Sequence, residues 1–263
     1  MIGNLIGVLF DGVAYGSLLF VISIGLSVTM GLMNFVNLAH GAFAMLGGYA
    51  CVMLMTRAGV PFLATLPVAF LVPAAAGIVL ERTLYQRLYK ATHLDQVMFS
   101  IGLVFMSVAA ATYFFGPSQQ PVRLPDFLRG QVHVFGLDLG AYRLFLIAVV
   151  VVITTVLTLL LVKTRFGAQV RASVDNAVAA AGLGIDVLGL DPTFPLKYMV
   201  YFLLVVAIGG AGTIKGGLVA AMILGICDVA GKYYVPQIGS FIIYFLMVAL
   251  MIVFPAGLYG RRT

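Results

Sequence analysis

The sequence is poor in charged residues and contains no tryptophan. Of its 263 residues, 9% are charged and 62% are hydrophobic. A soluble domain has about 25% charged residues, so this chain has too few to cover a water-exposed surface. A bilayer is the natural solvent, because a spanning helix needs about 20 mostly apolar residues and leaves charges for its ends. Without Trp, interfacial anchoring depends on Tyr and the basic side chains.

Cysteine and histidine are also scarce. The two cysteines, Cys51 and Cys227, both lie in apolar segments, which argues against a disulfide framework and is typical of small core residues. His40, His93 and His133 lie in three different regions, with no second ligand at helical spacing. The chain also lacks a Gly-Lys-Ser/Thr ending for a nucleotide loop. We therefore expect no catalytic residues, no metal site and no cofactor bound by this chain.

The net charge of +6 comes from fifteen Lys and Arg residues scattered between apolar runs. They form no continuous basic face, so nucleic acid is not an expected partner. A positive-inside membrane topology explains their distribution better.

The apolar residues form long runs that predict helices. We therefore predict an all-α fold, a polytopic membrane helix bundle forming a single transmembrane domain over residues 1–263. Several runs are shorter than a full span, as in broken or re-entrant helices. The eight visible runs are residues 5–30, 41–56, 62–80, 97–115, 143–162, 198–212, 217–230 and 240–254.

Three polar segments separate these runs. Residues 81–95 carry Leu84, Leu88 and Ala91 at helical spacing and predict an interfacial helix. Residues 116–141 are rich in proline and end in an alternating run at 132–135, which predicts an external loop with a small hairpin. Residues 163–186 are basic and predict a cytoplasmic loop.

The charge rule leads to a conflict in the number of crossings. Placing 81–95, 163–186 and the tail with Arg261 and Arg262 in the cytoplasm puts the N-terminus outside, and the first five runs then alternate. The last three runs would leave the tail outside. We therefore expect one further helix to be missing near residues 184–190.

A polar stripe interrupts the apolar sequence at Asn34, Asn37 and His40, which are three residues apart. On a helix they would share an arc of about 120°. Such groups in a membrane either hydrogen-bond neighbouring helices or line a wet pathway, and both readings are open. For His40 alone the structural reading is favoured, because no carboxylate or Cys lies at ligand spacing.

Glycine marks two places of close backbone approach. Gly12 and Gly16 favour tight packing of the first helix against a neighbour. The cluster from Gly209 to Gly217 predicts a tight turn between two short helices.

Several segments together resemble a known family. They are GLMNFVNLAHGAFAMLGGYA from Gly31, ERTLYQRLYK from Glu81, SIGL from Ser100, RASVDNAVAAAGLGI from Arg171, GGAGTIKGG from Gly209 and FPAGLYGRR from Phe254. In this order they resemble the permease subunits of bacterial branched-chain amino acid ABC importers. The Asn-Leu-Ala-His-Gly stretch is similar to the form found in one of that family's two paralogous permeases. Members usually have about one more helix near Asp186.

The resemblance implies a transport subunit of the bacterial inner membrane, with its N-terminus outside and its C-terminus cytoplasmic. It would form half of a translocation pathway for branched-chain or related small amino acids or amides. The implied partners are a paralogous permease in a heterodimer, two ATPase subunits that use ATP and Mg, and a periplasmic solute-binding protein. The implied ATPase-coupling helix contains Arg171, Asn176, Ala177, Ala180, Ala181, Gly182 and Gly184.

The alternative is an ion-coupled secondary transporter or a channel. Such proteins carry ionisable groups within the membrane. Asp11 and Asp228 are the only acidic residues within or near the apolar runs.

Overall fold

The computed structural model describes residues 2–33, 35–89, 91–122, 124–134, 137–163, 191–210 and 212–259. The chain divides into two compact units. The first unit comprises Met1–Ser27, Pro125–Ala172 and Tyr201–Thr263, and the second comprises Val28–Leu124 and Ser173–Val200.

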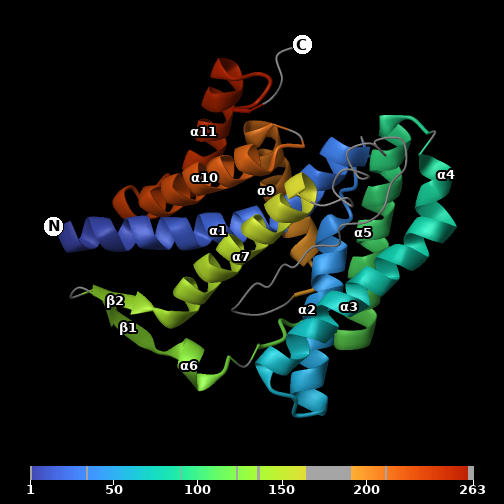
Figure 1. Ribbon diagram of the computed structural model, residues 1–263, viewed down its shortest axis with the longest axis horizontal. Helices are drawn as coiled ribbons and strands as arrows, with labels where there is room; N and C mark the ends of the chain where they lie inside the picture. The colour runs from blue at the N-terminus through green and yellow to red at the C-terminus, as the bar shows by residue number, and fades with distance from the viewer. Residues whose placement is uncertain are drawn as a thin grey trace. The chain divides into compact units, whose positions relative to one another are not determined.

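Every predicted apolar run is a helix, so the all-α membrane fold is confirmed (Figure 1). Among the described residues, five helices are long and apolar enough to cross a bilayer, and α9 and α11 are shorter apolar helices. The eight helices are α1 (Ile2–Met33), α2 (His40–Arg57), α3 (Phe62–Leu80), α5 (His93–Phe115), α7 (Ala141–Lys163), α9 (Phe194–Gly209), α10 (Ile214–Tyr234) and α11 (Gly239–Val253).

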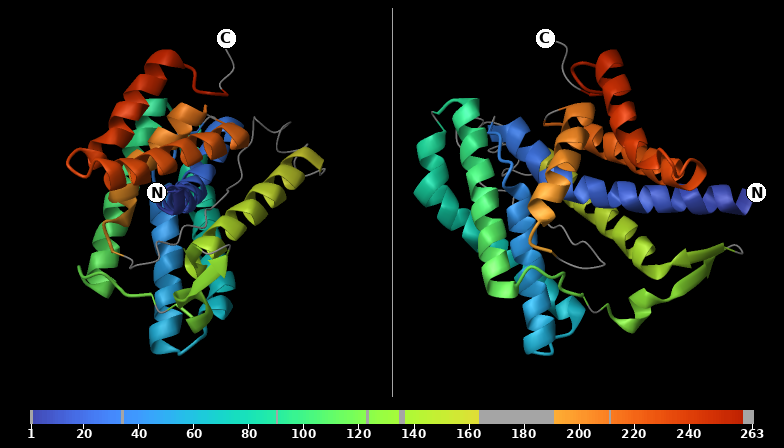
Figure 2. Two further views of the ribbon diagram at one scale, coloured as in Figure 1. Left: turned by 90° about the vertical axis from the view of Figure 1, so that its left-hand side faces the viewer. Right: turned by 180° about the vertical axis from the view of Figure 1, so that it is seen from behind.

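In the first unit, α1 and α10 lie against each other through small residues. A Cβ added to Gly12 would meet Ile226 Cα at 2.6 Å, and one added to Gly225 would meet Gly16 N at 2.3 Å. Gly217 lies opposite Phe20 further along. Because residue numbers rise along α1 as they fall along α10, the two helices are antiparallel, as Figures 1 and 2 show. The predicted close approach at Gly12 and Gly16 is confirmed.

The predicted turn between α9 and α10 is also confirmed. Gly210 and Gly212 have φ of 92° and 79°, which only glycine adopts readily. The Thr213 hydroxyl donates to the carbonyl oxygens of Gly209 and Gly210, at 3.0 and 2.9 Å. After α11 the chain returns to this turn, where the Leu258 amide donates to the Ile208 carbonyl at 2.7 Å. Two separated glycine-rich segments of the sequence therefore meet.

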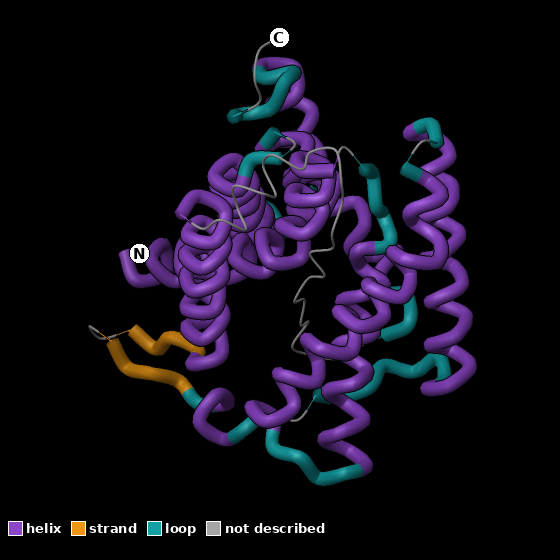
Figure 3. The backbone as a smooth tube through the Cα atoms, turned by 45° about the vertical axis from the view of Figure 1, so that its right-hand side comes forward, coloured by secondary structure: helices purple, strands orange, loops and turns teal. Residues whose placement is uncertain are grey.

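The segment before α7 forms the hairpin predicted from the alternation at 132–135. Strands β1 (Gln131–Val134) and β2 (Leu137–Gly140) pair antiparallel, with Val132 opposite Leu139. A short helix, α6 (Asp126–Arg129), precedes them (Figure 3). The hairpin leads into α7, where Arg143 forms an ion pair with Asp11 of α1.

In the second unit, α2 packs against both α3 and α5. Gly47 of α2 faces the backbone of α3, since a Cβ there would lie 2.5 Å from the Ala69 carbonyl oxygen. The buried cluster of this unit consists of Phe35, Ala39, Phe43, Tyr85 and Val104.

Residues 81–95 are not the single separate helix expected from the sequence. The helical path of α3 continues through the π-helical turn η1 (Glu81–Tyr85) into α4 (Gln86–Leu88). A new helix, α5, begins at His93, where Thr92 and Asp95 form a capping box. Thr92 starts α5, because its side chain accepts from the Asp95 amide.

The contact of Gly225 with α1 predicts a sharp difference between two Gly-to-Ala substitutions. In Gly225→Ala the added methyl meets α1 backbone atoms, so the helices must separate at a cost of about 1–3 kcal/mol. Gly102→Ala in α5 is the matched control, because nothing lies within 4 Å of its Cβ position. Thermal unfolding in detergent should show a lower Tm for Gly225→Ala alone. Equal Tm values would contradict the close α1–α10 contact.

Candidate functional site

The described part of the polar signature, Asn37 and His40, lies at the junction between two helices. Helix α1 ends at Met33 and α2 begins at His40, so Asn37 occupies the non-helical link between them. The expected helical arc of Asn34, Asn37 and His40 is therefore wrong, because the backbone is not helical through this stretch. Asn34 itself lies outside the described residues.

Asn37 shapes this link through its side-chain oxygen. Oδ1 accepts the Ala39 amide at 3.0 Å and the Tyr85 hydroxyl at 3.3 Å. The first bond closes a local turn just before α2. The second bond joins the link to η1, 48 residues further along the chain.

Gln96, in the first turn of α5, holds the same link from another side. Its Oε1 accepts the Val36 amide at 3.4 Å, and its Nε2 donates to the carbonyl oxygens of Leu88 and Ala91 at 3.3 and 3.4 Å. Gln96 is 4% exposed, so these bonds satisfy a buried amide. Residues 35–39 are thus attached to both η1 and α5, and we call this segment the junction loop.

Aromatic packing completes the attachment. The Tyr85 ring lies edge-to-face with Phe35 and Phe99, at centroid distances of 5.4 and 5.6 Å. Tyr89 also contacts Phe35 and donates its hydroxyl to Glu81. Burial, together with the Glu81 carboxylate, raises the pKa of the Tyr89 phenol, so the phenol remains a donor.

Sequence reasoning did not identify Tyr85 and Gln96. Gln96 carries a recognisable signal, because a glutamine at the start of an apolar run must find partners when it is buried. Tyr85 carries none, since a tyrosine at the end of a membrane helix is ordinary interfacial sequence.

His40 is the first residue of α2 and is 5% exposed. It follows the junction loop directly. A buried imidazole at a helix start is compatible both with a structural role and with a pathway lining, so its transport role stays a prediction.

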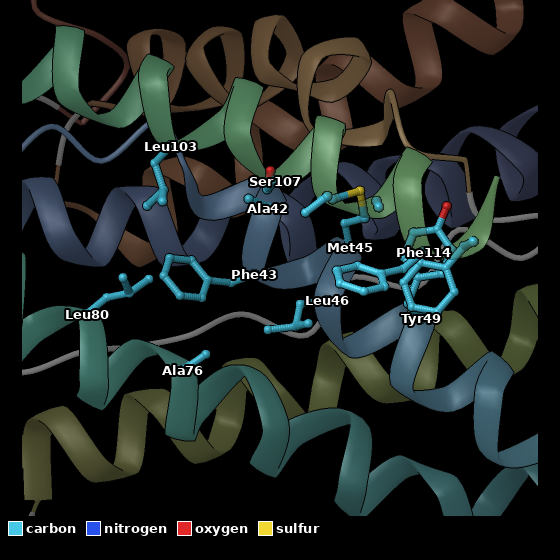
Figure 4. A pocket seen from close by; sticks show the side chains of 13 residues that line it. Ala42, Phe43, Met45, Leu46, Tyr49, Ala76, Leu80, Leu103, Ser107 and Phe114 are labelled. Carbon is cyan, nitrogen blue, oxygen red and sulfur yellow. The ribbon is translucent and has the colours of Figure 1, made fainter. Parts of the chain in front are cut away.

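An apolar cavity of about 330 Å³ lies in the second unit between α2, α3 and α5. Figure 4 shows Phe43 of α2 beside Leu80 of α3 and Leu103 of α5, with Leu46 further along α2 towards Tyr49. Its polar lining groups are Ser107, whose hydroxyl donates to the Val104 carbonyl at 2.7 Å, and Tyr49, whose ring stacks on Phe115 at 4.1 Å. The cavity can accept hydrocarbon but offers no partner for a charged group.

A second polar group lies in the first unit, around α10. Lys232 Nζ contacts Asp228 Oδ2 at 2.6 Å, and the Asp228 side chain is 2% exposed. Tyr201 of α9 is hydrogen-bonded to Tyr15 of α1 and Tyr244 of α11 beside this pair. Lys232 was also missed from the sequence, although its i,i+4 spacing from Asp228 is a usable signal.

The seven residues expected in the coupling helix, Arg171, Asn176, Ala177, Ala180, Ala181, Gly182 and Gly184, lie outside the described residues. Their role stays a prediction from the family resemblance.

Comparison with known proteins identifies the family. Residues 8–191 match the family described as branched-chain amino acid transport system / permease component. The high-affinity branched-chain amino acid transport permease BraD of Pseudomonas aeruginosa is 23% identical over 96% of this chain and 95% of its own length. The probable branched-chain amino acid transport permease LivH of Methanocaldococcus jannaschii is 26% identical over 96% and 92%. Escherichia coli LivH, named a high-affinity branched-chain amino acid transport system permease, is 23% identical over 96% and 94%.

No solved structure matches the chain. Because the family match covers well over half of the chain, this protein belongs to the branched-chain amino acid transport system permease family.

Proposed function

We propose that this chain forms half of a translocation pathway for branched-chain or related small amino acids or amides. The family match over residues 8–191 carries the proposal, together with the named function of the relatives. The chain is a multi-pass protein of the bacterial inner membrane and the transmembrane subunit of an ABC importer, without enzymatic activity of its own.

The partners follow from this assignment. We infer that the chain is the paralogue with the Asn-x-Ala-His-Gly signature and that it pairs with the other paralogous permease. Two ATPase subunits would bind and hydrolyse ATP with Mg, and a periplasmic binding protein would deliver the substrate. Closure of the ATPase subunits on ATP can shift the permease between inward and outward states only if the contacts between permease and ATPases differ in the two states. We propose residues 171–184 for those contacts.

The structure weighs against the alternative of an ion-coupled transporter. Both acidic candidates have a basic partner, since Asp11 pairs with Arg143 and Asp228 with Lys232. Each acidic residue therefore belongs to a pair with a basic partner, which offers a lone proton or cation no net electrostatic attraction.

The directions of the helices favour opposite sides of the membrane for the start of α1 and the C-terminal tail, as an N-terminus outside and a C-terminus in the cytoplasm require. Helices α1 and α7 run the same way, with the Asp11–Arg143 ion pair near the start of each (Figures 1 and 2). Helix α10 runs opposite to α1, so the turn at Gly210 lies at the inner end of α1. The tail contacts this turn through Leu258, which puts it on the cytoplasmic side once α1 starts outside.

The same geometry supports a missing crossing. With α1 starting outside, α7 ends on the inner side at Lys163. Helix α9 ends at the turn at Gly210, which is also on the inner side, so α9 must start on the outer side. One crossing between α7 and α9 is therefore required. Comparisons with relatives extend over 291 to 295 positions, whereas this chain has 263 residues. The relatives therefore have at least 28 positions without a counterpart here. The family match itself stops at residue 191. We infer that the absent positions include the span expected near residues 184–190.

Cysteine labelling tests this topology. In a chain with Cys51 and Cys227 replaced by Ala, Gln237→Cys in the exposed turn after α10 should react with a membrane-impermeant maleimide added to intact cells. His93→Cys, which is exposed at the start of α5, should react only after the cells are opened. Simple alternation of the eight helices would place residue 237 inside. Protection of that cysteine in intact cells would therefore contradict the additional crossing.

Two substitutions at Asn37 test the junction loop as part of the pathway. Asn37→Asp keeps the oxygen that accepts from Ala39 and Tyr85, so the fold and assembly should persist. Asn37→Leu loses both bonds and should lower stability by about 1–2 kcal/mol. A pathway role predicts that Asn37→Asp lowers uptake about tenfold, because it places a fixed charge beside the moving substrate. Tyr85→Phe is the control, with uptake within about twofold of the original. Normal uptake by Asn37→Asp would assign the residue to structure alone.

A further inference from the structure

The ion pair of Asp228 and Lys232 has free binding capacity on both partners. Lys232 Nζ contacts Asp228 Oδ2, while Oδ1 is buried and has no hydrogen-bond partner among the described residues. A buried carboxylate oxygen without a partner is costly, and native structures fill such positions. An ammonium group has three donors, so Lys232 also retains capacity beyond this contact.

The two partners differ in access. The side chain of Lys232 is 48% exposed and that of Asp228 is 2% exposed. Both lie in the last two turns of α10, which the helix directions place at the outer end of α1. A solute arriving from outside would therefore meet Lys232 first and reach Asp228 once the helices separate.

Aromatic side chains from three other helices surround the pair. Lys232 Nζ lies 5.8 Å from the ring centroid of Tyr15, and Tyr201 is hydrogen-bonded to both Tyr15 and Tyr244. The surroundings thus combine one positive group, one negative group and the phenol groups of tyrosines. A solute with a charge of only one sign is a poor match, because the residue of the pair with the same charge would repel it.

We propose that Asp228 and Lys232 form a binding site for the zwitterionic head group of the transported amino acid, at the outer end of the pathway. The substrate's ammonium group takes the free Oδ1 of Asp228, and its carboxylate takes Lys232 Nζ. A neutral zwitterion entering a neutral pair adds no net charge to the membrane interior, which keeps the desolvation cost low. This inference rests on the proposed amino acid transport, and it assigns to α10 a recognition role that the signature residues do not supply.

The test uses the complete importer with its partner subunits in proteoliposomes and radiolabelled leucine as the probe. Asp228→Asn, Lys232→Met and the double variant should each lower uptake about tenfold or more, because a charged contact to the substrate is lost. The double variant leaves no unpaired charge, so it should assemble normally. ATPase stimulation by the loaded binding protein should stay within about twofold, since docking on the permease is unaffected.

The matched control is the ion pair between Asp11 of α1 and Arg143 of α7, which also lies in the first unit. The double variant Asp11→Asn/Arg143→Gln removes a more exposed pair, with side chains 33% and 51% exposed, and should keep uptake within about twofold. The exchange variant Asp228→Lys/Lys232→Asp keeps an ion pair but reverses its polarity. It should assemble and fail to transport.

Original uptake in either the neutral double or the exchange variant would show that the pair is only structural and would overturn the site. An equal loss in the Asp11/Arg143 variant would overturn it as well, because the effect would then be general to outer charges. A wild-type importer that takes up neither leucine nor any other amino acid would overturn the proposed function itself. Failure of the site alone would leave wild-type uptake intact.

Discussion

The first unit depends on the close contact between α1 and α10. Lipid supplies no hydrophobic force between helices, so their association depends on packing and on hydrogen bonds. Gly12, Gly16 and Gly225 let the two backbones approach to distances at which an added methyl would collide with backbone atoms. Of the long apolar helices in the described parts of the chain, α1 is correspondingly the most buried, with 56% of its span buried against 6% for α7. The Asp228–Lys232 pair and Tyr15 lie on these two helices, so their arrangement depends on the same contact.

Most of the architecture could be predicted from the sequence, because lipid constrains the chain strongly. Spans must be helical and apolar, and the run at 62–80 coincided with α3 while the alternation at 132–135 marked the hairpin. The glycine cluster at 209–217 gave the turn, since a positive φ there leaves little choice of residue. These are local rules, and each acts within about one helix of sequence.

The candidate sites could be predicted only in part, because they depend on contacts between distant segments. The spacing of Asn34, Asn37 and His40 indicated a helical stripe, but the helix breaks at Met33 and the Asn37 oxygen bonds to Tyr85. A hydrogen bond across 48 residues leaves no periodic trace in a sequence. The prediction of one helix over residues 81–95 was also wrong. The apolar spacing continues through this segment, but the capping box at Thr92 starts a new helix at His93.

The two polar groups also differ in what they can do chemically. The junction loop offers an amide oxygen and backbone groups that are already bonded within the protein, so it can position helices without attracting a charged solute. The Asp228–Lys232 pair holds full charges of both signs and an oxygen whose bonding is incomplete. A pathway for zwitterions needs transient charged contacts that are weak enough to release the substrate, and a pair that already satisfies itself in part meets this condition. At the proposed site this internal attraction would compete with the substrate, which would keep binding reversible.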